Sequence, residues 1–167
     1  MEKLWSPWRS KYIESFKSDS DSSKCIFCQM VGLDPHDDCN LIINQSEFTF
    51  TVLNLYPYNN GHLMIVPKRH LSEFPELNDK ELFEVMKKLQ HAQLALTKAM
   101  KPHGFNIGVN IGRVSGAGIE EHIHFHIVPR WNGDTNFMPV IGEVKVISQD
   151  LLDTKKKLIE AYKEINL

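Results

Sequence analysis

The sequence has few cysteines, no long apolar run and almost no net charge. Three cysteines in 167 residues make a poor disulfide framework. No apolar run approaches the roughly 18 residues of a membrane-spanning helix, and residues 1–9 lack the apolar stretch of a secretory signal. With 19 basic and 21 acidic residues, the net charge of -2 would not draw the whole chain onto a nucleic-acid backbone. We therefore expect a cytoplasmic protein with neither a membrane nor a nucleic acid as its partner.

The composition of the chain is typical of one soluble globular domain. Hydrophobic residues make up 42% and charged residues 24% of the sequence, and the length suits a single core. Residues 1–24 differ from the rest, because two tryptophans among basic residues are followed by a polar, low-complexity stretch. We predict an N-terminal arm and polar connector at 1–24 and a single domain at 25–167.

The pattern of apolar residues after the connector indicates strands around one long helix. Apolar residues at helical spacing predict a helix from about 79 to 100, and a second helix is expected at 150–165. Runs of β-branched and aromatic residues predict strands at 41–43, 47–53, 62–66, 105–111 and 122–128, with one more at 137–147. This order predicts an α+β fold: an antiparallel five- to six-stranded sheet with one long central helix and a C-terminal helix.

Three histidines alternate with apolar residues in the segment from Glu121 to Arg130. Because side chains alternate between the two faces of a strand, His122, His124 and His126 would share one face, about 6.6–7 Å apart. Burying three imidazoles costs free energy unless each finds a hydrogen-bond partner or a metal. Two kinds of site fit this row: a three-histidine metal site, or a nucleophile flanked by helper groups, since a neutral imidazole has a free nitrogen near neutral pH.

Cys25 and Cys28 form a Cys-x-x-Cys motif that indicates metal or redox chemistry. One such motif is only moderately specific, because a zinc site needs two more ligands. From the residues alone, the other ligands could come from His36 and Cys39 nearby, or the two thiols could be free.

The segment His-Ile-His-Phe-His-Ile-Val-Pro-Arg at 122–130 resembles the signature of the histidine triad family, nucleotide-binding hydrolases and transferases with the motif His-φ-His-φ-His-φ-φ, where φ is apolar. The likeness includes residues 54–70, 104–112 and 129–137, and the N-terminal Leu-Trp-Ser-Pro-Trp-Arg. Together these stretches look most like the bacterial diadenosine tetraphosphate phosphorylases of that family. The resemblance covers nearly the whole chain and implies the histidine triad fold.

The resemblance also implies a role for individual residues. His124 matches the family's nucleophile, which attacks an α-phosphorus, and His126 matches the histidine that contacts the phosphate or the leaving-group oxygen. One departure is that Gly118 and Ile119 replace a glutamine and a Ser or Thr that hold phosphate oxygens in many members. The positions expected to bind nucleotide or phosphate are Asn54, Leu55, His62, Asn110, Ser115, Gly116, Ala117 and Gly118.

For the metal, the family likeness selects one ligand set. In zinc-bearing members and in the related uridylyltransferases, the remaining ligands are a histidine after the Pro-Lys turn and the first triad histidine. Here these are His70 and His122, which implies a structural zinc held with Cys25 and Cys28 and leaves His124 free to react. Magnesium is expected only in company with the polyphosphate substrate.

The activity that the resemblance implies is nucleotidyl transfer. The expected enzyme cleaves diadenosine tetraphosphate with inorganic phosphate to ATP and ADP, through an adenylyl-histidine intermediate. One alternative is a hydrolase of dinucleoside polyphosphates or adenosine phosphoramidates, and another is a catalytically silent nucleotide-binding module. The resemblance further implies a homodimer that pairs through the long helix and a sheet edge.

Overall fold

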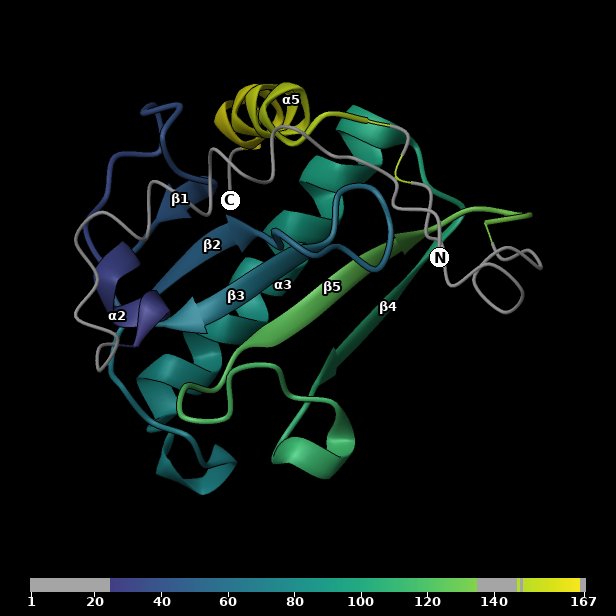
Figure 1. The fold of residues 1–167 in the computed structure, drawn as a ribbon. Coiled ribbons are helices and arrows are strands. Elements are labelled where there is room, and N and C mark those ends of the chain that lie inside the picture. Colours follow the sequence, from purple (N-terminus) through teal and green to yellow (C-terminus); the bar gives the residue numbers. More distant parts are fainter. Residues whose placement is uncertain (1–24, 135–146, 148, 166–167) are drawn as a thin grey trace, which may run out of the picture.

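The computed structural model describes residues 25–134, 147 and 149–165 (Figure 1). The arm predicted at 1–24 lies outside these residues, as does nearly all of the strand predicted at 137–147. In the described part of the chain, no helix is both long enough and apolar enough to cross a bilayer.

A five-stranded antiparallel sheet forms the centre of the fold (Figure 1). Its strand order is β1-β2-β3-β5-β4, so that β3 and β5 are neighbours and β1 and β4 are the edges. The strands are β1 (Ile42–Gln45), β2 (Thr49–Leu53), β3 (Leu63–Pro67), β4 (Gly104–Val109) and β5 (Phe125–Arg130). The predicted α+β fold with an antiparallel sheet is thereby confirmed.

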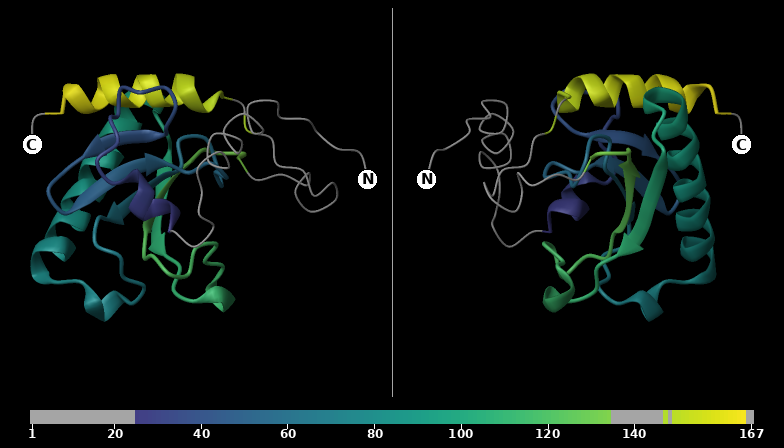
Figure 2. Two further views of the ribbon diagram at one scale, coloured as in Figure 1. Left: turned by 60° about the vertical axis from the view of Figure 1, so that its left-hand side comes forward. Right: turned by 90° about the vertical axis from the view of Figure 1, so that its right-hand side faces the viewer.

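Helix α3 (Asp79–Met100) covers one face of the sheet, and α5 (Leu151–Lys163) packs beside it (Figure 2). Asn78 caps α3 by accepting hydrogen bonds from the amides of Lys80 and Glu81, which explains why the helix begins there. Three short helices are α2 (Ile26–Met30), η1 (Phe74–Glu76) and η2 (Arg113–Ser115). Of these, α2 begins inside the Cys-x-x-Cys motif, with Cys25 at its N-cap and Cys28 within it, and the sequence pattern predicted no helix there.

The strand predicted at 122–128 begins later than expected, at Phe125. Its ladder with β3 ends at the pair Ile65↔Phe125. Two residues further along β3 stands Pro67, which has no N–H to donate to a ladder. The amide of Ile123 donates instead to the carbonyl of Leu71 at 2.8 Å, beyond the end of β3. Two of the three triad histidines therefore precede the strand.

The register of β5 sets which face of the sheet carries the histidines. Ile127, which is fully buried, pairs with Ile107, and His126 pairs with Gly108. Because neighbouring residues point to opposite faces, His126 points away from the core that α3 covers. The chemistry-bearing side chains thus gather on the face opposite α3, where α2 lies (Figure 2).

Candidate active site and metal centre

Cys25, Cys28, His70 and His122 come together in one cluster, with their ligand atoms all within 4.8 Å of one another. The Sγ of Cys28 lies 3.3 Å from Nδ1 of His70 and 3.6 Å from Nδ1 of His122, and the Sγ of Cys25 lies 3.3 Å from Nδ1 of His122. A tetrahedron with bonds of about 2.0–2.3 Å has edges of about 3.3–3.8 Å. The donor set and its spacing therefore fit a four-coordinate zinc ion.

The imidazole of His122 is held so that it offers a lone pair to the cluster. Its Nε2–H donates to the carbonyl of Pro67 at 2.8 Å, so the neutral ring carries no proton on Nδ1, the atom nearest the cysteines. The side chain is fully buried, and burial lowers the pKa of His122, which favours that neutral form. A second hydrogen bond that orients the ring in this way is usual for metal-ligating histidines.

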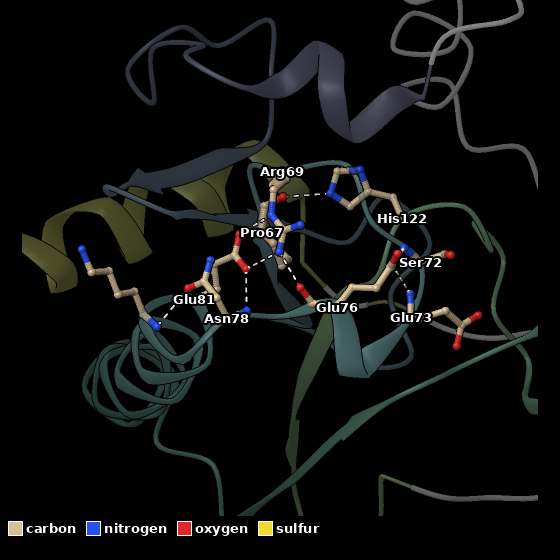
Figure 3. Close-up of polar contacts among 9 residues, drawn as sticks. Pro67, Arg69, Ser72, Glu73, Glu76, Asn78, Glu81 and His122 are labelled. Atoms are coloured by element: carbon tan, nitrogen blue, oxygen red, sulfur yellow. Dashed lines mark hydrogen bonds and ion pairs between the residues drawn. The ribbon is translucent and has the colours of Figure 1, made fainter.

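Arg69, the residue before His70, is bonded to Glu81 in the first turn of α3 (Figure 3). Arg69 makes a bidentate pair with Glu81, with Nε–Oε1 at 2.9 Å and Nη2–Oε2 at 2.7 Å, and it also donates to the carbonyl of Glu76. The hydrogen bond from Arg69 holds the pKa of Glu81 below its ordinary value. On the other side of His70, the carbonyl of Leu71 accepts from the amide of Ile123. His70 therefore lies in a stretch of chain that is fixed on both sides.

His124 has one nitrogen engaged and one available. Its Nδ1–H donates to the carbonyl of His122 at 2.8 Å, which leaves the lone pair on Nε2. Burial lowers the pKa of His124, so the ring is neutral near neutral pH. An oriented, neutral imidazole of this kind is a competent nucleophile.

His126 has the opposite arrangement of its proton and its lone pair. The amide of Tyr58 donates to Nδ1 of His62 at 3.0 Å, so the proton of neutral His62 is on Nε2, which donates to Nδ1 of His126 at 2.9 Å. The proton of His126 is thereby placed on Nε2, a buried atom with no hydrogen-bond partner among the described residues. Burial lowers the pKa of His126 to about 4. The site therefore combines an N–H donor with the lone pair of His124.

His62 forms a relay of hydrogen bonds between the amide of Tyr58 and His126, and Asn54 lies beside it. His62 is fully buried behind His126, although its sequence position suggested contact with the nucleotide. The Nδ2 of Asn54 lies 3.4 Å from Nδ1 of His62, and its Oδ1 accepts from the amide of Tyr56. Leu55, the next residue, is packed in part against the core.

The loop predicted to hold phosphate is exposed over most of its length. The hydroxyl of Ser115 donates to the carbonyls of Ile111 and Gly112, both at 2.7 Å, so it is engaged within the loop. Gly116 has a φ of 92°, a left-handed conformation that suits glycine. Of the other predicted residues, Ala117 and Gly118 follow in the same loop, and Asn110 stands directly after β4.

An open pocket of about 430 Å³ next to this loop is acidic. Its lining includes the carboxylates of Glu73, Glu120 and Glu121, together with Gly112 and Gly118. Carboxylates repel phosphate oxygens, so this side of the loop disfavours a polyphosphate. The N–H of His126, which has no hydrogen-bond partner among the described residues, suits anionic oxygens better.

Two aromatic residues near the histidines carried no predicted role in the site. The ring of Phe27 lies 5.0 Å from that of His124 and 5.4 Å from that of His122, between centroids. The ring of Tyr58 lies 4.6 Å from that of His62. The only signal for Phe27 was its place inside the Cys-x-x-Cys motif, and Tyr58 stood in a predicted turn.

Comparisons with known sequences agree with this geometry. A family profile described as "HIT domain" matches residues 36–133. The AP-4-A phosphorylase of Mycobacterium tuberculosis is 42% identical over 163 residues, which cover 95% of this chain and 83% of that protein. The adenosine 5'-monophosphoramidase of Schizosaccharomyces pombe is 30% identical over 65% of this chain and 75% of its own.

Solved structures share the fold. A protein of Sulfolobus tokodaii described as a hypothetical histidine triad nucleotide-binding protein superposes with a TM-score of 0.66 at 26% identity, over 83% of this chain and 92% of that one. A zinc-bound histidine triad family protein from Mycobacterium smegmatis has a TM-score of 0.68 at 23% identity, over 86% and 96% of the two chains.

Proposed function

The chain belongs to the HIT (histidine triad) domain family, and on that premise we propose that it is an enzyme that cleaves diadenosine tetraphosphate with inorganic phosphate to ATP and ADP. The observation that carries the proposal is the pair of complementary nitrogens, a free lone pair on His124 and a free N–H on His126. The similarity to an AP-4-A phosphorylase over 95% of the chain supports the choice of substrate.

The first step is a displacement at phosphorus. Nε2 of His124 attacks the α-phosphorus of one adenylate, a P–N bond forms, and the bond to the β-phosphate oxygen breaks, so that ATP leaves. The N–H of His126 donates to an oxygen that gains negative charge during this step. Because the donor is already buried and oriented by His62, little reorganisation is needed as that charge develops.

The second step regenerates the imidazole. An oxygen of inorganic phosphate attacks the adenylyl phosphorus, the P–N bond to His124 breaks, and ADP is released. Water in place of phosphate would release AMP from the same intermediate. The similarity to adenosine 5'-monophosphoramidases keeps a hydrolase as the second candidate, since it needs only a different acceptor at the same nucleophile. A catalytically silent nucleotide-binding module is less well supported, because it would leave the orientation of both nitrogens without a purpose.

We assign a structural zinc to Cys25, Cys28, His70 and His122. Thiolates and imidazoles suit tetrahedral zinc, and four protein ligands leave no open coordination position for substrate. The metal would therefore stabilise the fold, and no group of the reaction has to bind to it.

The proposal includes a homodimer. β4 is an edge of the sheet, and Ile107 on it is 51% exposed. The outer side of α3 also exposes Phe83 (68%) and Met86 (60%). An unpaired edge and exposed apolar side chains favour association, and a second copy of the chain would cover both.

Product analysis tests the activity. Purified protein is incubated with diadenosine tetraphosphate with and without inorganic phosphate, and we expect ATP and ADP only when phosphate is present. The His124→Ala variant should lose turnover and still bind nucleotide, whereas His36→Ala, which changes an exposed histidine outside the cluster, should behave as wild type. ATP and AMP in both conditions would identify a hydrolase instead, and full turnover by His124→Ala would refute the mechanism.

A further inference from the structure

The nucleophile of the proposed reaction is not held by the sheet. His124 precedes β5, whose ladder to β3 ends at Phe125. The amide of Ile123 is bonded outside the strand ladder, to the carbonyl of Leu71. Something other than strand pairing must therefore orient the imidazole of His124, because a reacting group has to be held close to its productive geometry.

Two contacts on His124 come from the four-residue cluster and from the residue between its two cysteines. The carbonyl of His122 accepts from Nδ1 of His124, and the ring of His122 is itself held by Pro67 and by the two cysteines. This hydrogen bond determines which nitrogen of His124 carries the proton. A change in the backbone at His122 would consequently alter the tautomer of His124.

The other contact is the ring of Phe27, between the two cysteines in the sequence. Phe27 is 1% exposed and lies against the rings of both His122 and His124, at 5.4 and 5.0 Å. Its helix, α2, has only five residues and no side-chain hydrogen bond at its N-cap, Cys25. A helix of this length is not stable by itself. Phe27 also packs in the core, with its ring 6.4 Å from that of Phe50 between centroids. Because Cys25 and Cys28 flank it in the sequence, the way the two cysteines are held contributes to the position of its ring.

We propose that the Cys-x-x-Cys segment, residues 25–28, is a positioning element for the nucleophile. By holding the main chain of His122 and the ring of Phe27, the four-residue cluster keeps the imidazole of His124 in one rotamer and one tautomer, with Nε2 turned toward the substrate. Phe27 is a positioning residue, since it acts through His124. The inference rests on the proposed function for the role of His124, and it gives the structural metal centre an effect on the reaction that passes through these two contacts.

We expect disruption of the Cys-x-x-Cys segment to lower kcat while leaving nucleotide binding nearly unchanged. If the Cys-x-x-Cys segment is no longer held by the cluster, the imidazole of His124 samples several orientations, and fewer of them place Nε2 in line with the phosphorus. Loss of a supporting partner of this kind typically lowers activity about 10–100-fold. The nucleotide contacts expected at Asn54 and Leu55 lie on another segment, so we expect KM to change by less than about threefold.

Three variants of the metal-loaded full chain test the inference. Phe27→Leu keeps all four ligands and removes the ring, and Cys28→Ser removes one ligand. Cys39→Ser is the matched control, because Cys39 is exposed and stands outside the cluster. For each variant we measure metal content, thermal midpoint, kcat and KM, and the histidine ring nitrogens by long-range 1H–15N NMR, with His124→Ala used to assign the signal of His124.

We expect wild type and Cys39→Ser to show His124 as a single tautomer protonated on Nδ1. Cys28→Ser should lose metal, and both Cys28→Ser and Phe27→Leu should show averaging of the two His124 nitrogens and the fall in kcat. A folded, metal-loaded Phe27→Leu with the wild-type His124 signal would overturn the inference even if Cys28→Ser fails to fold. Since the NMR signature needs no turnover, a protein that does not act on diadenosine tetraphosphate would refute the proposed function and leave this result standing.

Discussion

At the scale of single residues, three histidines present different atoms to this site, and the hydrogen bonds of each histidine determine which atom it presents. His122 donates from Nε2 to a carbonyl and offers Nδ1 to the cysteines. His124 donates from Nδ1 to a carbonyl and keeps the lone pair on Nε2. His126 accepts at Nδ1 from His62 and therefore carries its proton on Nε2. The partner of one nitrogen thus determines the chemistry of the other.

The relay behind His126 leads to the first prediction. In His62→Phe, the donor to Nδ1 of His126 is lost, so His126 is free to protonate on Nδ1 and present a lone pair to the substrate oxygen. We expect kcat to fall about 10–100-fold, as for other orienting partners, and KM to change little. His62→Gln, which retains an N–H donor, should keep more activity. Steady-state kinetics measure both, and a wild-type kcat in His62→Phe would show that the relay does not orient His126.

At the scale of elements, α3 and the β1–β2 hairpin are joined by one carboxylate. The Oε1 of Glu84 accepts from the amides of Phe48 and Thr49 and from the hydroxyls of Ser46 and Thr49, at 2.7–2.9 Å. Burial acts to raise the pKa of Glu84, but these hydrogen bonds outweigh it and hold the pKa below its ordinary value. The ionised form therefore stabilises the packing of the helix against the hairpin.

This carboxylate has a predictable pH dependence. Because the folded-state pKa is lowered, the stabilisation is fully present above the unfolded value of about 4.5 and is lost as the pH falls through the lower folded value. Glu84→Gln should lower the free energy of unfolding at pH 7 by about 1.5–3 kcal/mol, and the difference from wild type should shrink below pH 4.5. Urea unfolding at several pH values measures this, with the exposed Glu47→Gln as control. A difference independent of pH would contradict the assignment.

At the scale of the whole molecule, the β4 edge of the sheet is where a second copy of the chain would bind in the proposed dimer. The ladder of β4 with β5 uses one side of the strand, and the other side has no strand partner among the described residues. Ile107→Lys places a charge at this edge and should convert the proposed dimer to a monomer. Val114→Lys adds the same charge at a fully exposed position in η2 and should leave the dimer intact. Light scattering after size-exclusion chromatography measures both masses, and a wild-type monomer would refute the dimer.

Much of this protein is determined by local sequence. The spacing of apolar residues predicted α3 from 79 to 100, and Asn78 with Glu81 explains where it begins. The alternation of histidines with apolar residues predicted a reactive face, because the period of a strand is a property of a few neighbouring residues. Family resemblance added His70 and His122 to the two cysteines, and the structure brings these four side chains together.

Only the tertiary structure decided the state of each histidine. His62 is 64 residues away from His126, and Cys28 is 42 residues from His70, so no local pattern could show that they touch. The start of β5 at Phe125 depends on Pro67 in a neighbouring strand. The period of a strand specifies which side chains share a face, whereas the direction of a hydrogen bond depends on the atom that packing places opposite it. The sequence by itself therefore indicated which histidines are candidates for the reaction, and the packing of distant segments decided which nitrogen of each is free.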